Sequence, residues 1–557
     1  MSNITNVDVL IVGGGAGGTA AAWQAARMGV SVLVAEESPW LGGMITAAGV
    51  SAFDGNKDAM GSGFFRQFRD AIEAHYATRG GTKTGWISDT CFEPKVGADL
   101  LKNYVAESGA KVWHGAILEE VLLEGKKIVG AKIRHDGALK EVRAKVTVDA
   151  TEYGDVLNLA KVPFSLGREA KSETGEPDAI EKHDSEVQDL TFVATLKLHP
   201  GGAPPVPRPE GYDANIFDCS TSQICSTPDR AIVNHYLHDW ESFLSYSTIP
   251  NDKHLLNWPF HANDSPDTLA VFGTREEREV ALQAAKHRTL CYVHYMQNDL
   301  GHPEWGLATD EYGTADNLPH MPYMRESRRV YGVKKMMEQD VLPVGGGARA
   351  KFAADGVAAG DYYLDHHHSK AHLPLEKRLI ENYPKNAPFQ IPYGALVPRE
   401  HDGLLAAEKN ISVSHIVNGC TRLQPCVMLT GQAVGAAAAL AAKNNIQPRA
   451  VDVNALQNIL IEAGAAPYPT IDVHPSHPHF KSIQRLSMAG LRSDDDSIAF
   501  EPDSRLPEAE AKRLATLWEE ASGAPAAETL ALWKRGMKKG EFFAVIDAKR
   551  PRSPLGQ

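Results

Sequence analysis

The chain of 557 residues lacks features that mark several common classes of protein. Its six cysteines include no Cys-x-x-Cys pair, which argues against a zinc ribbon or dithiol relay and favours free thiols. Basic residues number 57 against 70 acidic ones, and the net charge of −13 argues against nucleic acid or an anionic membrane as a partner. We expect no membrane span and no signal peptide, because no apolar run appears long enough and a core strand begins close to Met1. The chain is therefore expected to be a cytoplasmic globular protein of two or three domains.

A glycine-rich turn near the start of the chain carries the strongest signal. The β-branched run Val7–Val12 predicts a buried parallel strand, and glycines follow where that strand turns into a helix. Gly13 permits a tight turn, Gly15 brings backbone N–H groups against a pyrophosphate, and Gly18 lets the helix lie close to the strand. Glu36 ends the next strand, where its carboxylate can bind ribose hydroxyls and repel a 2′-phosphate. The pattern predicts a dinucleotide site that disfavours NADP.

The periodicity of apolar residues predicts the elements that follow. Helices are expected over 64–76, 98–108, 275–300 and 431–441, and strands over 111–123, 128–134, 141–149 and 190–198. The strands between 111 and 149 are expected to form a small sheet. A Pro- and His-rich stretch at 468–480 then separates a more charged tail, which predicts a further small helical unit.

Short motifs spread along the chain give it a family resemblance. They are Gly13–Gly18, Trp40–Met44, Phe92–Val96, Asp149–Thr151, Leu166–Glu169, Tyr323–Arg329, Asp355–Asp361, Ile391–Tyr393, Ile411–His415 and Arg422–Ala433. With these motifs the chain, over about residues 5–445, resembles the FAD-dependent oxidoreductase family of the glutathione-reductase-like flavoprotein fold. The resemblance implies an α/β fold whose Rossmann-like FAD-binding domain is discontinuous, over 1–165 and 345–465. An α+β substrate domain over 166–344 would interrupt it, and the helical C-terminal unit would cover 475–557.

The resemblance also implies how FAD would lie. Glu36 would hold the adenosine ribose, Ile117 and Leu118 would meet the adenine, and Gly42 to Met44 would line the flavin. The helix that begins near Gln424 would direct its dipole at the flavin pyrimidine. Noncovalent FAD is expected, because the loop at 40–44 contains neither histidine nor cysteine. The expected FAD-binding residues are Gly13, Gly15, Ala16, Gly17, Gly18, Glu36, Glu37, Gly42, Gly43, Met44, Ile117, Leu118, Ala150, Thr151, Gln424 and Gly431.

The catalytic candidates each have a structural alternative. His415 is the first candidate for acid or base, against a hydrogen-bonded core histidine. Arg325 and Arg328 are candidates to clamp a carboxylate or polarise a carbonyl, against structural pairing with Glu326 or Asp361. Tyr393 is a candidate to bind substrate, against a backbone partner.

The sequence His366-His-His368 resembles a metal cluster by composition, but we expect no metal there. Consecutive residues of an extended segment point to opposite faces, so at most two of the three can share an ion. Asp361 and His366 are candidates for the active-site wall instead. Cys420 and Cys426 are too far apart in sequence for a disulfide relay beside the flavin.

The segment from His479 to Glu510 resembles one S-layer homology repeat. Pro507 and Glu508 stand where such repeats carry threonine and arginine, so an anion replaces the cation that would meet a wall polymer. We therefore expect a packing or oligomer-contact unit, and a homo-oligomer is possible.

These features together predict hydride transfer between flavin N5 and a polar small molecule. Dehydrogenation of a sugar, polyol or hydroxy acid is the leading version, because Trp258, His261, Trp305 and Tyr323 crowd the inserted domain. Reduction of an activated C=C bond is the alternative enzymatic version. A non-catalytic flavin-binding protein is the third possibility.

Overall fold

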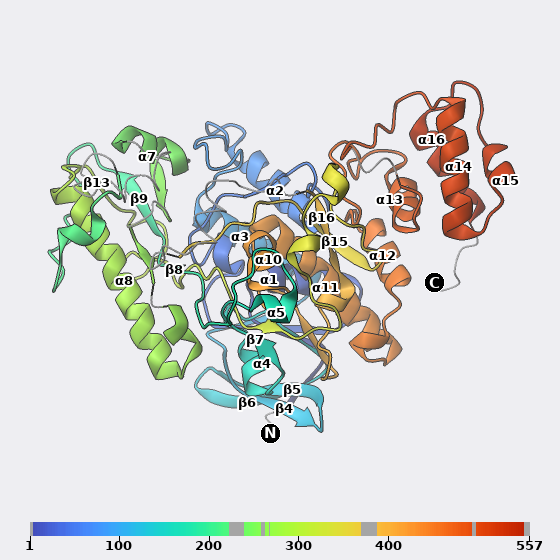
Figure 1. Cartoon of the computed structure of the whole chain (residues 1–557). Coiled ribbons are helices and arrows are strands. Elements are labelled where there is room, and N and C mark those ends of the chain that lie inside the picture. The colour runs from blue at the N-terminus through green and yellow to red at the C-terminus, as the bar shows by residue number, and fades with distance from the viewer. Residues whose placement is uncertain are drawn as a thin grey trace.

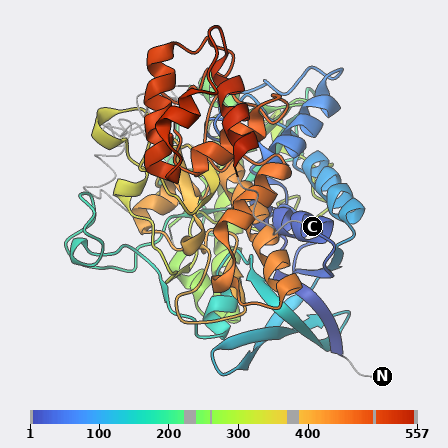
Figure 2. The same ribbon diagram turned by 90° about the vertical axis from the view of Figure 1, so that its right-hand side faces the viewer.

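The structure is a central parallel-sheet unit with a smaller unit on each side (Figure 1). It is a computed structural model that describes residues 4–221, 239–257, 262–266, 268–368, 387–492 and 497–550. Elements α7, α8, β9 and β13 lie on the left of the sheet in Figure 1, and α14, α15 and α16 on the right. Figure 2 shows that these C-terminal helices and the N-terminal end of the chain lie at opposite ends of the molecule.

The central sheet has the strand order β3-β2-β1-β6-β5-β4, with β17 paired to β6. Strands β1, β2, β3, β6 and β17 are parallel, with Ile11 opposite both Val34 and Val148. Strands β4 and β5 extend the same sheet as an antiparallel pair next to β6, so the expectation of a separate small sheet is wrong. The strand bounds are β1 Ile4–Val12, β2 Val32–Glu36, β3 Lys111–His114, β4 Ile117–Glu124, β5 Lys127–His135, β6 Ala138–Asp149 and β17 Leu404–Ala406.

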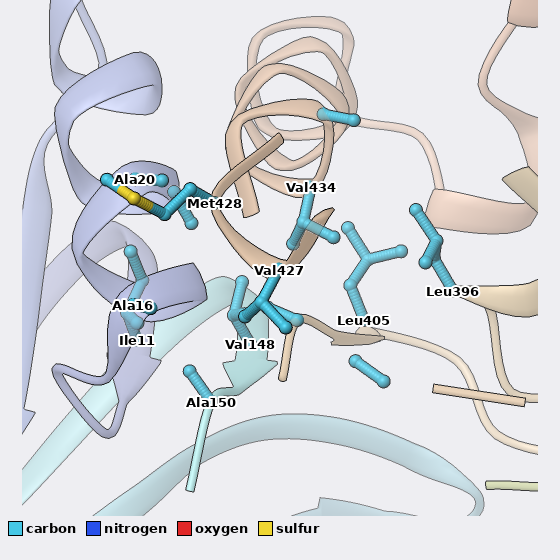
Figure 3. Packing of buried hydrophobic residues seen from close by; sticks show 14 of the residues in the cluster. Ile11, Ala16, Ala20, Val148, Ala150, Leu396, Leu405, Val427, Met428 and Val434 are labelled. Atoms are coloured by element: carbon cyan, nitrogen blue, oxygen red, sulfur yellow. The ribbon is translucent and has the colours of Figure 1, made fainter. Parts of the chain in front are cut away.

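Helices α1 (Ala16–Arg27) and α11 (Gln424–Asn444) pack side by side against this sheet, although about 400 residues separate them. Glycine makes the close approach possible: a Cβ on Gly431 would lie 2.1 Å from the carbonyl oxygen of Gly17. Figure 3 shows Ala16, Ala20, Met428 and Val434 meeting Val148 and Leu405 of the sheet in this core. The late return of β17 and α11 to the first βα unit confirms the discontinuous Rossmann-like domain.

By length and composition alone, helix α11 could cross a membrane. The expectation that no segment of the chain is long and apolar enough for this was therefore wrong. In the structure 94% of the most apolar stretch of this helix is buried, as in the core helix of a globular protein. The elements that complete the central unit are α2 Gly63–Tyr76, α3 Pro94–Ser108, α4 Asp155–Leu159, α5 Lys171–Thr174, α10 His415–Thr421, α12 Val453–Glu462, β7 Phe164–Ser165, β14 Arg329–Val330, β15 Gly356–Gly360 and β16 Phe389–Pro392.

The unit on the left is built on α8, whose capping box joins Thr274 and Glu277 at its start. This helix confirms the one expected over 275–300, and its buried face packs with Phe243 and Leu196. Trp305 lies in the same cluster, whereas Trp258 and His261 lie outside the described residues. Cys219 is disulfide-bonded, which corrects the expectation of free thiols for this residue. The elements are β8 Leu190–Thr191, β9 Ala194–Leu198, α7 Trp240–Ser247, β10 Thr248–Ile249, β11 Lys253–Leu256, β12 Asp264–Ser265, α8 Arg275–Asn298 and β13 Trp305–Leu307.

The C-terminal unit is helical, as expected, and has an apolar cluster of its own. Phe480, Leu514, Trp518 and Phe542 are buried at its centre. Its helices are α13 Phe480–Met488, α14 Glu508–Ser522, α15 Ala526–Leu530 and α16 Lys539–Lys549. The three domain boundaries and the likeness of this unit to an S-layer repeat stay predictions.

Candidate functional site

The turn between β1 and α1 has the geometry that the glycine pattern predicts. Gly13 has a φ of +97°, and its N–H donates to the carbonyl oxygen of Ala35 at 2.8 Å. A Cβ on Gly13 would lie 2.1 Å from the carbonyl oxygen of Ala150, and one on Gly18 would lie 2.2 Å from that of Gly13. Both contacts are far closer than any Cβ makes, so the tight turn and the close helix packing each require glycine.

A pocket of about 380 Å³ lies beside this turn, between the central unit and the unit that carries α8. The expected FAD-binding residues that line it are Gly13, Gly15, Glu36, Glu37, Gly43, Leu118, Ala150 and Thr151. The remaining ones, which are not part of the lining, are Ala16, Gly17, Gly18, Gly42, Met44, Ile117, Gln424 and Gly431. The sequence reasoning missed the lining residues Ser38, Phe192, Arg275, Arg278, Lys286 and His320, most of which come from the inserted part of the chain.

Glu36 lies at the pocket end of β2 and is buried. Its carboxylate accepts hydrogen bonds from the backbone N–H of Gly14 and, at 2.7 Å, from that of Ser38. Burial raises the pKa of the Glu36 carboxyl to about 7, against the opposing effect of these two hydrogen bonds. Glu36 is therefore positioned where the sequence predicts a ribose-binding acid.

The N-terminus of α1 is capped by a distant carboxylate. An oxygen of Glu408 accepts hydrogen bonds from the N–H groups of Gly17 at 2.6 Å and Gly18 at 3.3 Å. Beside it, the Lys409 ammonium lies 2.5 Å from a carboxylate oxygen of Glu152, and all three side chains are buried. Burial raises the pKa of Glu408 to about 7, although Lys409 opposes the shift. Glu408 therefore occupies the N–H groups at which a pyrophosphate is expected.

The expected FAD-binding residues outside the pocket lining make structural contacts. Gly42 donates its N–H to the carbonyl oxygen of Gly14 at 2.8 Å, which joins the two glycine loops. Gln424, the first residue of α11, exchanges hydrogen bonds with Asp54 through its side-chain amide. Gly431 packs against Gly17. Roles of these residues in cofactor binding stay predictions.

A largely buried polar network begins at Tyr323, the residue that directly follows the pocket-lining residues His320, Met321 and Pro322. Arg422 donates to the Tyr323 hydroxyl and, at 2.8 Å, to Asp365. His367 lies between two carboxylates, 3.4 Å from Asp365 and 3.3 Å from Asp264. Arg325 completes the series, 3.2 Å from Asp264. Arg325 and Tyr323 were singled out from the sequence, and Arg422 and His367 lie in motifs discussed there. The grouping itself was not predicted, because its members come from four separate segments.

The guanidinium groups of Arg325 and Arg422 lie 4.8 and 5.9 Å from the centre of the Tyr323 ring. In each of them the Nε–H is buried and has no acceptor among the described residues. Buried donors without acceptors are rare in folded proteins, so a missing ligand is a natural explanation for a pair of them.

Other catalytic candidates lie apart from this network. Arg328 makes a structural pair, but with Asp155 at 3.1 Å rather than with Glu326 or Asp361, and it donates to backbone carbonyls. The Tyr393 hydroxyl donates to the carbonyl oxygen of Pro448 at 2.7 Å, as in its alternative. Burial raises the pKa of Asp361 to about 6.

His415 is the first residue of α10 and is buried, with its Nδ1 3.0 Å from the Glu326 carboxylate. Burial and the nearby Arg329 lower the pKa of His415 to about 3, so the ring is neutral at pH 7. The structure groups it with His366 and His368 rather than with the Arg325–Arg422 network. A neutral ring cannot donate a proton as an imidazolium, so the lowered pKa does not favour His415 as the acid, and its role as a base stays a prediction.

A parallel sheet, a glycine turn at a helix N-terminus and an acid at the end of β2 define a dinucleotide-binding protein of the Rossmann type. The model of the family described as FAD dependent oxidoreductase matches residues 8–460. The chain therefore belongs to the FAD-dependent oxidoreductase family and is an enzyme that uses FAD.

Curated relatives match only part of the chain. The digeranylgeranylglycerophospholipid reductase of Thermoplasma acidophilum is 30% identical over 173 residues, which cover 28% of this chain and 42% of that protein. The protein of that name from Picrophilus torridus is 29% identical over 162 residues, 27% of this chain and 40% of its own length. Matches to these relatives thus span about two fifths of their length. Among solved structures, a geranylgeranyl bacteriochlorophyll reductase-like protein from T. acidophilum has 12% identity and a TM-score of 0.36, covering 95% of this chain and 99% of its own.

The residues of the pocket fit FAD with one condition. Gly13, Thr151 and Glu36 surround the end of β1 as an adenosine site requires. The buried Lys409 ammonium, paired with Glu152, lies beside Glu408 at the start of α1. The condition concerns Glu408, whose carboxylate holds the N–H groups of Gly17 and Gly18. A diphosphate can bind those groups only when Glu408 has turned away from them.

Proposed function

We propose that this enzyme reduces a C=C bond activated by a carboxylate or carbonyl group on a small polar molecule. The observation that carries the proposal is the pair of buried guanidinium Nε–H groups of Arg325 and Arg422 beside Tyr323, both without an acceptor among the described residues. The oxygens of a carboxylate supply such acceptors, and arginine is the residue best shaped to bind them.

His367 decides the direction that we propose. Burial and Arg325 lower the pKa of His367, but its contacts with Asp365 and Asp264 outweigh them, so the pKa is raised above its usual value of 6.5. A protonated imidazole can give a proton and cannot accept one. Dehydrogenation of a hydroxyl group needs a proton acceptor, whereas reduction of a C=C bond needs a donor, so His367 favours reduction.

Each residue of this network has a separate role in the proposed reaction. FAD, once reduced, would supply the hydride that one carbon of the double bond receives. Arg325 and Arg422 hold the oxygens of the activating group, so that negative charge developing there is stabilised. Because both ring nitrogens of His367 face carboxylates, its proton would reach the other carbon through Asp365, and the ring would be left neutral. The relatives' printed name, a reductase, supports this direction, while the buried charges favour a polar substrate over a lipid chain.

Anaerobic half-reactions test the proposal. The reduced holoenzyme is mixed with fumarate or a short 2-enoate, and the visible absorbance of oxidised FAD is followed. We expect these acceptors to restore the oxidised spectrum, and we expect sugars, polyols and hydroxy acids to leave the oxidised holoenzyme unchanged. If a hydroxy acid bleaches the oxidised flavin while the enoates fail to reoxidise the reduced form, the dehydrogenase expected from the sequence is correct instead.

The rate of reduction is expected to fall as pH rises through the raised pKa of His367. The acid form is populated below that pKa and is lost above it, by about tenfold for each pH unit. A pH profile of kcat/KM for the enoate measures this. In His367→Gln the alkaline limb should disappear and the rate below the pKa should drop. A variant with an unchanged profile would exclude His367 as the acid.

A further inference from the structure

Three buried histidines converge on the side of the His366–His368 segment that faces α10. One ring nitrogen of each of His366, His368 and His415 lies within 4.8 Å of one ring nitrogen of the other two. The Nε2 atoms of His368 and His415 are 3.3 Å apart. His367 points to the opposite side, toward Asp264 and Asp365. The alternation expected from the sequence is thus present, and the third imidazole comes from His415 instead of His367.

The spacing of the two Nε2 atoms fits a shared metal ion. Zinc–nitrogen bonds are about 2.0–2.1 Å long, and two of them at the tetrahedral angle place their nitrogens about 3.4 Å apart. The value of 3.3 Å between His368 and His415 agrees with that geometry.

Outer contacts orient two of the rings. The Nε2 of His366 lies 3.0 Å from the carbonyl oxygen of Ile416, which leaves its buried Nδ1 with no hydrogen-bond partner among the described residues. The Nδ1 of His415 faces the Glu326 carboxylate at 3.0 Å, so its Nε2 is the nitrogen directed at His368. Carbonyl and carboxylate groups on the far nitrogen are the usual outer partners of metal-binding histidines.

The three rings are buried, and the nearest cations are already paired. Arg329 is paired with Glu326 and Glu169, Lys335 with Glu169, and Arg168 with Asp184.

Helix α10 has a glycine where the His366–His368 segment packs against it. A Cβ on Gly419 would lie 2.6 Å from the Nε2 of His366 and 2.8 Å from the carbonyl oxygen of Asp365. Glycine at this position therefore lets His366 reach the helix that carries His415.

We propose that His366, His368 and His415 bind one divalent transition-metal ion, for which zinc fits the ligand set best. The ion would tie the segment after β15 to the start of α10. It would thereby fix the intervening His367 between Asp264 and Asp365, on the other side of the same segment.

Metal analysis of the full-length protein, prepared without a polyhistidine tag, tests the site. We expect about one zinc per chain by elemental mass spectrometry. After chelation, Co²⁺ should restore binding and give the intense visible bands of a tetrahedral site. His366→Gln and His368→Gln should lose the metal and the Co²⁺ bands, whereas the partly exposed surface variant His183→Gln should keep both.

The alternative is a metal-free hydrogen bond between the His368 and His415 rings. Wild-type protein that contains no metal and shows no tetrahedral Co²⁺ spectrum would establish that alternative and overturn the proposal. The wild-type Co²⁺ titration decides the matter even if a variant fails to fold. Neither readout depends on the substrate, so failure here is distinct from failure of the proposed reductase.

Discussion

Glu408→Gln is expected to bind FAD about tenfold more tightly than the wild-type protein. The wild-type carboxylate holds the Gly17 and Gly18 N–H groups, so a diphosphate must displace one anion with another. Glutamine keeps the shape and an acceptor oxygen but removes the charge, and about 1.4 kcal/mol of relief corresponds to tenfold. Fluorescence titration of the apoprotein with FAD measures the Kd.

Glu408→Asp is the matched control for this prediction. It keeps the charge and shortens the side chain, so its affinity should rise less than that of the glutamine variant. Weaker FAD binding in Glu408→Gln would show instead that the carboxylate holds the cofactor, and our interpretation of the cap would be wrong.

Arg422→Met is expected to lower kcat/KM for enoate reduction at least about 100-fold and to destabilise the fold by about 3–5 kcal/mol. The substitution removes a proposed substrate-binding donor and also leaves the partly buried Asp365 without its closest cation. Steady-state kinetics and denaturant unfolding measure the two effects separately.

The double variant Arg422→Met/Asp365→Asn separates stability from catalysis. Because it also removes the uncompensated carboxylate, much of the lost stability should return while the activity stays low. Recovery of activity together with stability would mean that Arg422 only supports the fold.

Local patterns predicted the first part of the site well. The glycine turn and Glu36 follow from a strand, a turn and a helix within 30 residues, and the structure gives each the expected geometry. The fold class followed in the same way, because the glycine turn lies between a strand and a helix and the helix over 64–76 has strong apolar periodicity.

Groups that meet only through the tertiary fold were missed. Glu408 caps a helix 391 residues away, and no local signal marks such a pairing. The sequence argument that His366, His367 and His368 cannot all face one ion was sound, since His367 points away. It did not include His415, which lies 47 residues further along the chain. The strands between 111 and 149 were recognised, but pairing with β1 and β2 depends on long-range contacts that periodicity does not encode.

The pairing of β17 with β6 and of α11 with α1 also fixes when this enzyme can fold. During synthesis the first βα unit leaves the ribosome long before residues 404–444. Its apolar face therefore remains exposed until these residues have been synthesised and can pack on it. A fragment that ends before β17 lacks both the sheet partner and the helix that cover that face. Nascent chains of this enzyme therefore depend on late translation for a stable nucleotide-binding core, and premature termination yields an aggregation-prone product rather than a free domain.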